Sequence, residues 1–299
     1  MGNRPDTRGE LGAFLKSRRA RVLPDDLGIA TGSRRRVPGL RREELAQLAG
    51  VSADYYVRLE QGRAGHPSDS VLEAIARALQ LDDAERAHLY DLARPVPRRR
   101  RPARPERLRP ELQILLDTLD RVPAYVLGRR MDVLAWNRLA AALVIDFDSL
   151  PPDQRNTAKL IFLDEDMRLQ YPDWPEAARE TVAHLRLLAG RHPDDPQLAE
   201  LIGELSMKSE EFRLWWAHHD VREKSHGAKR LMHPIVGPLT LYYETLALRA
   251  DPDQVLVTYV AEPGSESDTA LRLLGSMGDL ATPLPQPARP GSQSEESAW

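Results

Sequence analysis

The sequence contains no cysteine among its 299 residues. Disulfide bonds, cysteine-based zinc fingers, iron–sulfur clusters and cysteine catalysis are therefore excluded. No apolar run approaches the length of a membrane span, and the first residues lack the core of a signal peptide, so we expect a cytoplasmic protein. With 41% hydrophobic and 29% charged residues, the composition is that of globular domains, and the length has room for two of them.

Motifs that mark enzymes and metal sites are missing as well. The sequence has no glycine-rich phosphate loop, no nucleophile elbow and no His-Glu-x-x-His pattern. Four histidines invite a metal site, but the adjacent pair His218 and His219 would point to different faces of any regular element. No carboxylate near His226 or His233 completes a known ligand spacing. We therefore expect no enzyme, no bound metal and no cofactor.

Charge is divided unevenly along the chain. Residues 1–110 hold 23 Lys and Arg against 15 Asp and Glu, a net charge of +8. Residues 111–299 hold 19 against 30, a net charge of −11, and the overall value of −3 hides this division. A basic front and an acidic rear indicate a domain that binds a polyanion, joined to a body that stays away from the polyanion.

Two short helices that meet at a tight turn are predicted within residues 41–62, RREELAQLAGVSADYYVRLEQG. Gly50 can take the positive φ that ends the first helix, and Ser52 is placed to cap the second. Tyr56 and Leu59 then carry the inward face of the second helix. Such a pair is suited to laying its second helix in the major groove of DNA, and an ordinary corner between two helices is the alternative.

Three further helices are predicted around this pair, at residues 10–22, 68–79 and 82–93, because apolar residues recur there at helical spacing. Five helices in about ninety residues predict a compact all-α domain. The polar loop at residues 24–39 contains three adjacent arginines at 34–36. An arginine run is usually a solvated face, but this run leads into a helix start beside the groove-reading pair, where we expect it to bind phosphate.

The order of LKSRR, REELAQLAGVS, YYVRLEQGR and VLEAIARALQL resembles the Cro/C1-type (XRE) helix-turn-helix. The fuller string RRRVPGLRREELAQLAGVSADYYVRLEQGR, followed by PSDSVLEAIARALQLDDAERAHLYDLA, resembles more narrowly the MmyB-like transcription regulators of bacteria. The likeness is strong over residues 8–93 and continues more weakly to about residue 278. It implies a DNA-binding domain at residues 8–93.

By position, the resemblance places Ala53, Asp54 and Arg58 where such repressors carry base-reading side chains. Arg58 can donate two hydrogen bonds to a guanine, and Asp54 can accept one from a cytosine or serve instead as a second helix cap. Arg42 matches the position that clamps a phosphate at a helix start. The expected DNA contacts are Arg34, Arg35, Arg36, Arg41, Arg42, Ser52, Ala53, Asp54, Tyr55, Arg58 and Arg63.

The resemblance also implies a partly buried ion pair between Arg19 and Glu60, which would join the first and third helices. After this domain, residues 94–110 hold eight arginines and five prolines in the stretch RPVPRRRRPARPERLRP. This composition forms no packed element, so we expect a semi-extended linker. Non-specific phosphate contacts are a secondary role for it.

A second domain is predicted over residues 111–280, followed by a disordered tail at 281–299 that is rich in Pro, Ser and Gln. A β-hairpin at residues 124–136 leads to Asn137, which is placed to cap a helix, and this opening looks like that of a PAS-like sensor fold. The later expected elements are helices at 154–163, 176–189, 197–205, 210–217 and 265–277, and strands at 236–246 and 255–261. The predicted class is α+β overall, with an all-α five-helix domain first.

The resemblance implies that the second domain encloses an apolar pocket for a fatty-acid-like ligand. For each apolar side chain, the alternative is that it only fills the core. A carboxylate on such a ligand would need a polar partner, for which Arg222, Lys229 and Arg230 are available. The expected ligand-binding residues are Trp136, Leu139, Leu143, Phe162, Trp215, Arg222, Leu231, Leu241 and Tyr243.

These features predict a sequence-specific DNA-binding transcriptional regulator whose C-terminal domain senses a small apolar ligand. We expect a homodimer on a pseudo-palindromic operator in double-stranded DNA, with the ligand changing the arrangement of the two DNA-binding domains. No membrane partner is expected. One alternative is a DNA-bound scaffold whose C-terminal domain recruits transcription machinery, such as RNA polymerase, without a small ligand. A second alternative, an enzyme fused to a DNA-binding domain, has no residues in the sequence to support it.

Overall fold

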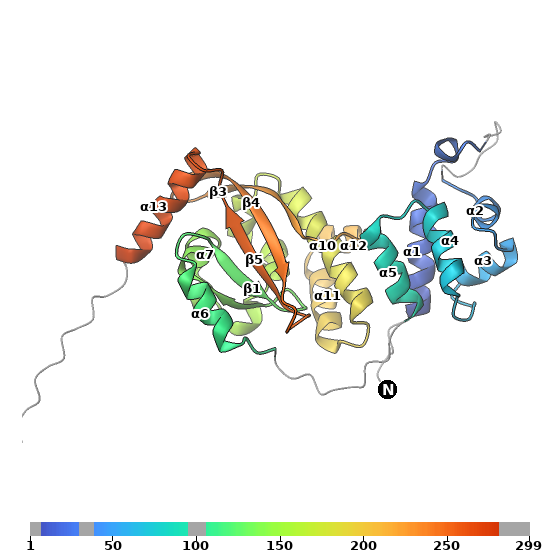
Figure 1. Cartoon of the computed structure of the whole chain (residues 1–299), viewed down its shortest axis with the longest axis horizontal. Coiled ribbons are helices and arrows are strands. Elements are labelled where there is room, and N and C mark those ends of the chain that lie inside the picture. The colour runs from blue at the N-terminus through green and yellow to red at the C-terminus, as the bar shows by residue number, and fades with distance from the viewer. Residues whose placement is uncertain (1–6, 30–38, 95–105, 281–299) are drawn as a thin grey trace, which may run out of the picture.

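The computed structural model describes residues 7–29, 39–94 and 106–280 of the chain. Residues 7–29 and 39–94 form a helical head at one end of the molecule, and residues 106–280 form a body that contains a β-sheet (Figure 1). Three predicted features lie wholly or mostly outside the described residues: the arginines at 34–36, the linker at 94–110 and the tail at 281–299.

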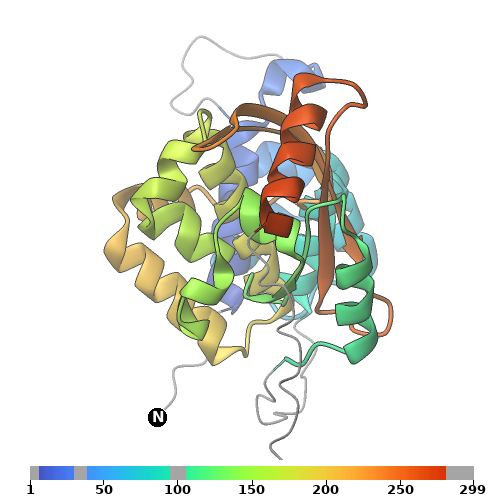
Figure 2. The ribbon, with the colours of Figure 1, turned by 90° about the vertical axis from the view of Figure 1, so that its left-hand side faces the viewer.

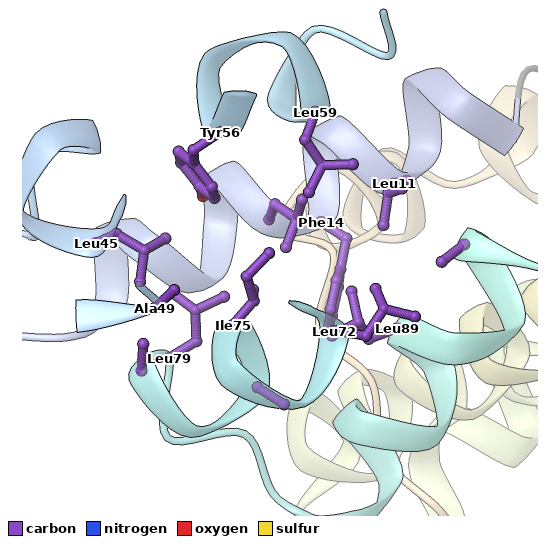
Figure 3. Close-up of a cluster of buried hydrophobic side chains, with 14 of the residues drawn as sticks. Leu11, Phe14, Leu45, Ala49, Tyr56, Leu59, Leu72, Ile75, Leu79 and Leu89 are labelled. Atoms are coloured by element: carbon purple, nitrogen blue, oxygen red, sulfur yellow. The ribbon is translucent and has the colours of Figure 1, made fainter. Parts of the chain in front are cut away.

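The head has the five α-helices that the sequence predicts. They are α1 (Thr7–Arg21), α2 (Arg42–Leu48), α3 (Ala53–Glu60), α4 (Asp69–Ala78) and α5 (Asp83–Ala93), with a 3-10 turn, η1 (Pro24–Leu27), after α1. The apolar faces of these helices meet in one core (Figure 3). Phe14, Tyr56 and Ile75 are fully buried in this core, so three helices far apart in sequence depend on it.

Two glycines shape the head for different reasons. Gly50 has φ +66° at the turn between α2 and α3, and nothing lies within 4 Å of a Cβ built on it, so the backbone conformation requires the glycine. Ser52 Oγ then accepts a hydrogen bond from the Tyr55 backbone N–H at 3.1 Å and caps α3, as predicted. Gly12 of α1 allows close approach instead, because a Cβ there would lie 2.1 Å from the carbonyl oxygen of Glu60. Helix α1 therefore packs directly against the end of α3.

The body is built on a five-stranded antiparallel sheet in the order β2-β1-β5-β4-β3. Its strands are β1 (Ala124–Leu127), β2 (Val133–Trp136), β3 (His226–His233), β4 (Gly237–Ala247) and β5 (Val255–Val260). Tyr125 pairs with Val257, and Tyr243 pairs with Tyr259, so these four side chains share one face, here called the inner face. This sheet and its helices confirm the predicted PAS-like α+β fold.

Helices cover both faces of the sheet. On the inner face lie α7 (Arg138–Leu143), α8 (Thr157–Leu163) and α9 (Glu165–Gln170), with two 3-10 turns, η2 (Phe147–Ser149) and η3 (Pro152–Gln154), between α7 and α8. On the outer face, α6 (Pro110–Thr118) packs Leu116 against Val126 and Leu256. The last helix, α13 (Glu266–Leu280), packs on α7 and β4 at the side of the body away from the head (Figures 1 and 2).

A second layer of helices lies between the sheet and the head. It consists of α10 (Trp174–Arg191), α11 (Pro196–Lys208) and α12 (Glu210–Trp216), and α10 packs directly against α5 of the head (Figure 1). These three helices and α8 were predicted from helical spacing of apolar residues. Because α10 touches both the head and the rest of the body, it connects them.

The sequence prediction missed two elements, α9 and β3. The buried positions of β3 alternate as they should in a strand, but they are Lys229, Leu231 and His233. Two of the three are polar, so the apolar alternation that marks a strand is absent from the sequence. His233 is satisfied by structural hydrogen bonds, with Nε2 2.9 Å from the carbonyl oxygen of Ala142 and Nδ1 accepting from the Ile235 N–H at 3.2 Å.

Candidate nucleic-acid interface and ligand pocket

The outward face of α3 is exposed at the end of the head farthest from the body (Figure 1). Ala53, Asp54 and Arg58 lie on this face, and Tyr56 and Leu59 face the core. The amphipathic pattern of the helix explains this division, since the buried residues follow each other at a spacing of three. The residues that the sequence assigned to base reading are therefore free of the body.

Asp54 and Arg58 contact each other on this surface. Arg58 Nε lies 3.4 Å from Asp54 Oδ2, one helical turn away, and the two side chains are 55% and 81% exposed. Ser52 is the residue that caps α3, and the Asp54 carboxylate contacts Arg58 instead. An ion pair this exposed contributes only about 0.5 kcal/mol, so Arg58 can leave it for a stronger acceptor.

Glu60 at the end of α3 holds two arginines. Its carboxylate is 2% exposed, and Arg19 Nη2 of α1 lies 2.9 Å from its Oε1, as the resemblance implied. Arg19 also donates to the Leu40 carbonyl oxygen at 2.6 Å. Arg42 donates from Nε to the other oxygen of the same carboxylate. Arg42, the predicted phosphate clamp, thus has one edge of its guanidinium held by Glu60 and its side chain 44% exposed.

The remaining predicted DNA contacts surround α3. Arg41 is exposed, and its backbone N–H donates to Glu44 Oε2 at 2.6 Å as part of the cap of α2. Arg63 is exposed directly after α3. Tyr55 is half-buried against the head core. Exposed arginines therefore lie at the start of α2 and beyond the end of α3, on either side of the reading face in sequence.

A pocket with an enclosed volume of about 50 Å³, partly open to solvent, lies between the inner face of the sheet and the helices that cover it. Sites that hold small ligands are usually larger, so an occupant of more than a few atoms requires the lining side chains to move apart. Most of the lining is apolar or aromatic. The lining residues are Tyr125, Leu127, Met131, Val144, Thr157, Leu160, Ile161, Met167, Tyr171, His184, Lys224, Lys229, Tyr243, Thr245, Val255, Val257 and Tyr259.

Four tyrosines form much of the aromatic wall. The hydroxyl oxygens of Tyr125 and Tyr259 lie 3.1 Å apart in a hydrogen bond. Burial raises the pKa of the hydroxyls of Tyr125, Tyr171 and Tyr259, and it raises the pKa of Tyr243 to about 12. All four are therefore neutral near pH 7, and this wall carries no negative charge.

Lys224 and Lys229 bring positive charge to the pocket. Lys229 Nζ lies 3.7 Å from Glu180 Oε2, and the other oxygen of Glu180 is 3.1 Å from Arg222 Nη1. Burial, together with the positive charge of Lys229, lowers the pKa of Lys224 to about 7. One carboxylate thus faces three basic groups. The excess positive charge fits an anionic group on a ligand.

His184 of α10 lies at the same edge of the pocket, and it is uncharged near pH 7. Burial lowers its pKa to about 4, and the positive charge of Lys224 contributes. A neutral imidazole can accept or donate a hydrogen bond, so it adds a polar partner without adding charge.

The structure places one of the nine predicted ligand-binding residues, Tyr243, in this lining. Phe162 and Trp215 pack together in the helical layer, with ring centres 6.3 Å apart, and Arg222 is exposed on its pair with Glu180. The others, Trp136, Leu139, Leu143, Leu231 and Leu241, belong to the hydrophobic cluster between the sheet and its helices.

Sequence reasoning missed most of the lining. The alternation of the predicted strand at 255–261 already put Val255, Val257 and Tyr259 on one face, and that signal could have found them. Nothing in the sequence marks Lys224, because it lies outside every predicted element. Its position depends on how the chain enters β3.

Among the described residues, no three or more His, Asp or Glu side chains gather in a way that could hold a metal ion. No helix in this part of the chain is both long enough and apolar enough to cross a membrane.

Two known domain families match the chain. Residues 108–274 match the family described as the MmyB-like transcription regulator ligand binding domain, which is more than half of the chain. Residues 10–89 match a family described as a helix-turn-helix domain. No curated protein matches the chain. Both matched domains are those of a DNA-binding regulator with a ligand-binding part, and neither is an enzyme domain.

The contacts of Glu60 with Arg19 and Arg42, here called the Glu60 clamp, should stabilise the head. Glu60→Gln removes the charge that Arg19 and Arg42 share, and leaves Arg19, which is only 12% exposed, without a carboxylate. We expect the free energy of unfolding to fall by roughly 3 kcal/mol, because a buried charge loses its partner. Denaturant unfolding of the full chain measures this loss.

Glu73→Gln is the matched control. Glu73 pairs with Arg86 at 2.8 Å in the same head, but both side chains are well exposed, so the loss there should stay below about 1 kcal/mol. Equal stability of the two variants would contradict a structural role for the Glu60 clamp.

Proposed function

This chain belongs to the MmyB-like transcription regulators, and from that premise we propose that it reads DNA with α3 and responds to an anionic, fatty-acid-like ligand held in the pocket of the body. The proposal rests on one observation, which is how the exposed face of α3 and the pocket of the body are arranged. The exposed face of α3 is turned away from the body, and the body has an apolar pocket edged by two lysines. One chain thus has a surface for DNA and a separate site for a signal.

Reading by α3 rests on Arg58. Its exposed guanidinium can leave the weak pair with Asp54 and donate two hydrogen bonds to a guanine in the major groove. Arg41, Arg42 and Arg63 are the candidates for phosphate contacts, because they are exposed around α3. The three arginines at 34–36 remain part of this proposal as further phosphate contacts.

A second copy of the chain completes the DNA contact. Helix α3 has eight residues, so one head reads only a few base pairs. Regulators of this kind place two reading helices in successive major grooves, about 34 Å apart, on a pseudo-palindromic site. We therefore propose a homodimer on such an operator.

Arg58→Ala tests base reading. The variant should lose roughly 1–3 kcal/mol of discrimination at one base pair in each half-site, because the bidentate donor is gone. Genome-wide footprinting beside the wild type measures the change, and we expect paired half-sites one helical turn apart. Arg213→Ala, which removes an exposed arginine from α12 in the body, is the control and should leave the sites unchanged.

Unchanged sites and occupancies in Arg58→Ala would contradict direct reading by α3. Single, unpaired half-sites in the wild type would contradict the dimer.

The pocket supports an apolar ligand with one anionic end. Its walls are leucine, valine, isoleucine, methionine and neutral tyrosine side chains, which suit a hydrocarbon chain. Lys224 and Lys229 are available to a carboxylate, which would compete with Glu180 for Lys229. Arg230, another candidate from the sequence, is paired with Asp173 at 2.7 Å and is not part of the lining.

Dodecanoate is a suitable probe for this ligand class. It should raise the melting temperature of the full chain in proportion to the logarithm of its concentration, since it binds the folded state. Dodecanol, which has the same chain without the carboxylate, should raise it less.

The affinity for dodecanoate should depend on pH in a defined direction. Lys224, with a pKa of about 7 in the free protein, is charged below pH 7 and loses its proton as the pH rises. The anion prefers the charged form, so affinity should fall by up to about tenfold per pH unit above 7.

Lys224→Met should remove this pH dependence, whereas Lys208→Met should keep it, because Lys208 pairs with Glu204 on α11 outside the lining. No melting shift with any acyl compound would refute the ligand and favour the scaffold that recruits transcription machinery without one.

A further inference from the structure

Helix α10 takes part in both the pocket and the contact with the head. Near its middle, Glu180 pairs with Lys229 and His184 lines the pocket. Leu187 and Gly190, in its last turns, meet the head, where Leu187 is fully buried in the head core. The distance along a helix from His184 to Leu187 is less than one turn, about 4.5 Å, so the two contacts are neighbours on a rigid element.

A second connection runs through residues 217–225, the segment between α12 and β3. At its head end, Arg18 of α1 donates to the carbonyl oxygen of His219 and lies 3.1 Å from Asp220 Oδ1. Val221 is buried in the core of the head. Three residues later, Lys224 lines the pocket. An extended chain of three residues spans only about 10 Å, so movement of Lys224 acts directly on Val221.

The head and α10 meet without spare room. A Cβ at Gly190 would lie 2.5 Å from Nδ1 of His88 on α5, so only glycine lets the two helices come this close. The His88 ring in turn packs edge-on against Phe14 of α1, with ring centres 5.1 Å apart. Tight contacts of this kind do not deform gradually, and a displaced α10 would separate from α5.

Each arginine at this contact also has a partner in its own domain. Arg18 of the head lies 3.4 Å from Glu85 of α5. Arg186 of α10 reaches across to Glu10 at 2.9 Å, and it also lies over the ring of Trp216 and donates to the Trp216 carbonyl oxygen. If the head left the body, neither charge would be buried without a partner. The two arginines therefore do not prevent the contact from opening.

We propose that an anion in the pocket loosens the docking of the head on the body, through α10 and the segment at residues 217–225. The proposal rests on the proposed function, because it needs an anionic ligand in the pocket. The ligand competes with Glu180 for Lys229 and draws Lys224 toward itself. The head holds Val221 and Asp220 in place at the other end of the same short segment.

The backbone conformation of residues 217–225 supports the proposal that the ligand loosens the docking of the head. His219 has φ +57°, a left-handed conformation that residues with a side chain rarely adopt, at the residue whose carbonyl oxygen Arg18 holds. Undocking releases Arg18 from that carbonyl and frees the segment to follow Lys224. By linkage, the factor by which the ligand weakens docking equals the factor by which docking weakens ligand binding, so a variant that docks less tightly should bind the ligand more tightly.

Gly190→Ala is the direct test. It adds one methyl group between α10 and α5, and alanine favours the helix more than glycine does, so α10 itself stays intact. We expect the full-length variant to bind dodecanoate about fivefold or more tightly than the wild type in calorimetry. Gly203→Ala on α11 makes the same change where nothing lies within 4 Å of the new methyl group, and should bind as the wild type does.

Asp220→Asn provides a second route if Gly190→Ala folds poorly. It removes the charge opposite Arg18 at an exposed position and should also tighten binding, to a smaller extent. Equal or weaker binding by both variants would overturn the coupling and leave the ligand pocket standing. Absence of dodecanoate binding to the wild type would refute the pocket's proposed ligand, and the coupling with it.

Discussion

The close packing of α10 against the head is the constraint on which the arrangement of this protein depends. Gly190 lets the His88 ring of α5 approach α10, and Leu187 completes the head core from the side of the body. A helix that belongs to one domain and closes the core of another cannot move without changing both. The head is therefore docked on α10, which contributes Glu180 and His184 to the polar edge of the pocket. Helix α3 remains exposed at the far end of the head.

Charged groups in the head are held in two different ways. Glu60 joins α1 to α3 through Arg19 and also holds Arg42 at the start of α2. One edge of the Arg42 guanidinium is thereby fixed, while part of the side chain stays at the surface. On α3 the weak pair between Asp54 and Arg58 has the opposite character, because it is exposed and easily exchanged. The head thus combines an arginine that is fixed at the start of α2 with an arginine on α3 that can change partners.

The helix-turn-helix could be predicted in detail because its signals are local. Gly50, Ser52 and the inward Tyr56 act within a few residues of their own position, and the structure has each of them in the predicted role. The pocket could not be predicted in this way. Its lining comes from strands paired by register and from α10, and β3 has Lys229 and His233 at buried positions where an apolar residue is expected. Lys224 faces the pocket only because of the path of a segment without regular structure, which no periodicity in the sequence encodes.

Communication between pocket and head is the central claim, and hydrogen exchange of the full chain with and without dodecanoate tests it most directly. Amides of β5 beside the pocket should exchange more slowly when the ligand is bound, which reports that the site is filled. In the same sample, amides of α5 and of residues 217–225 should exchange faster, because the head is less tightly docked. Slower exchange in β5 with unchanged or slower exchange in α5 would contradict the account.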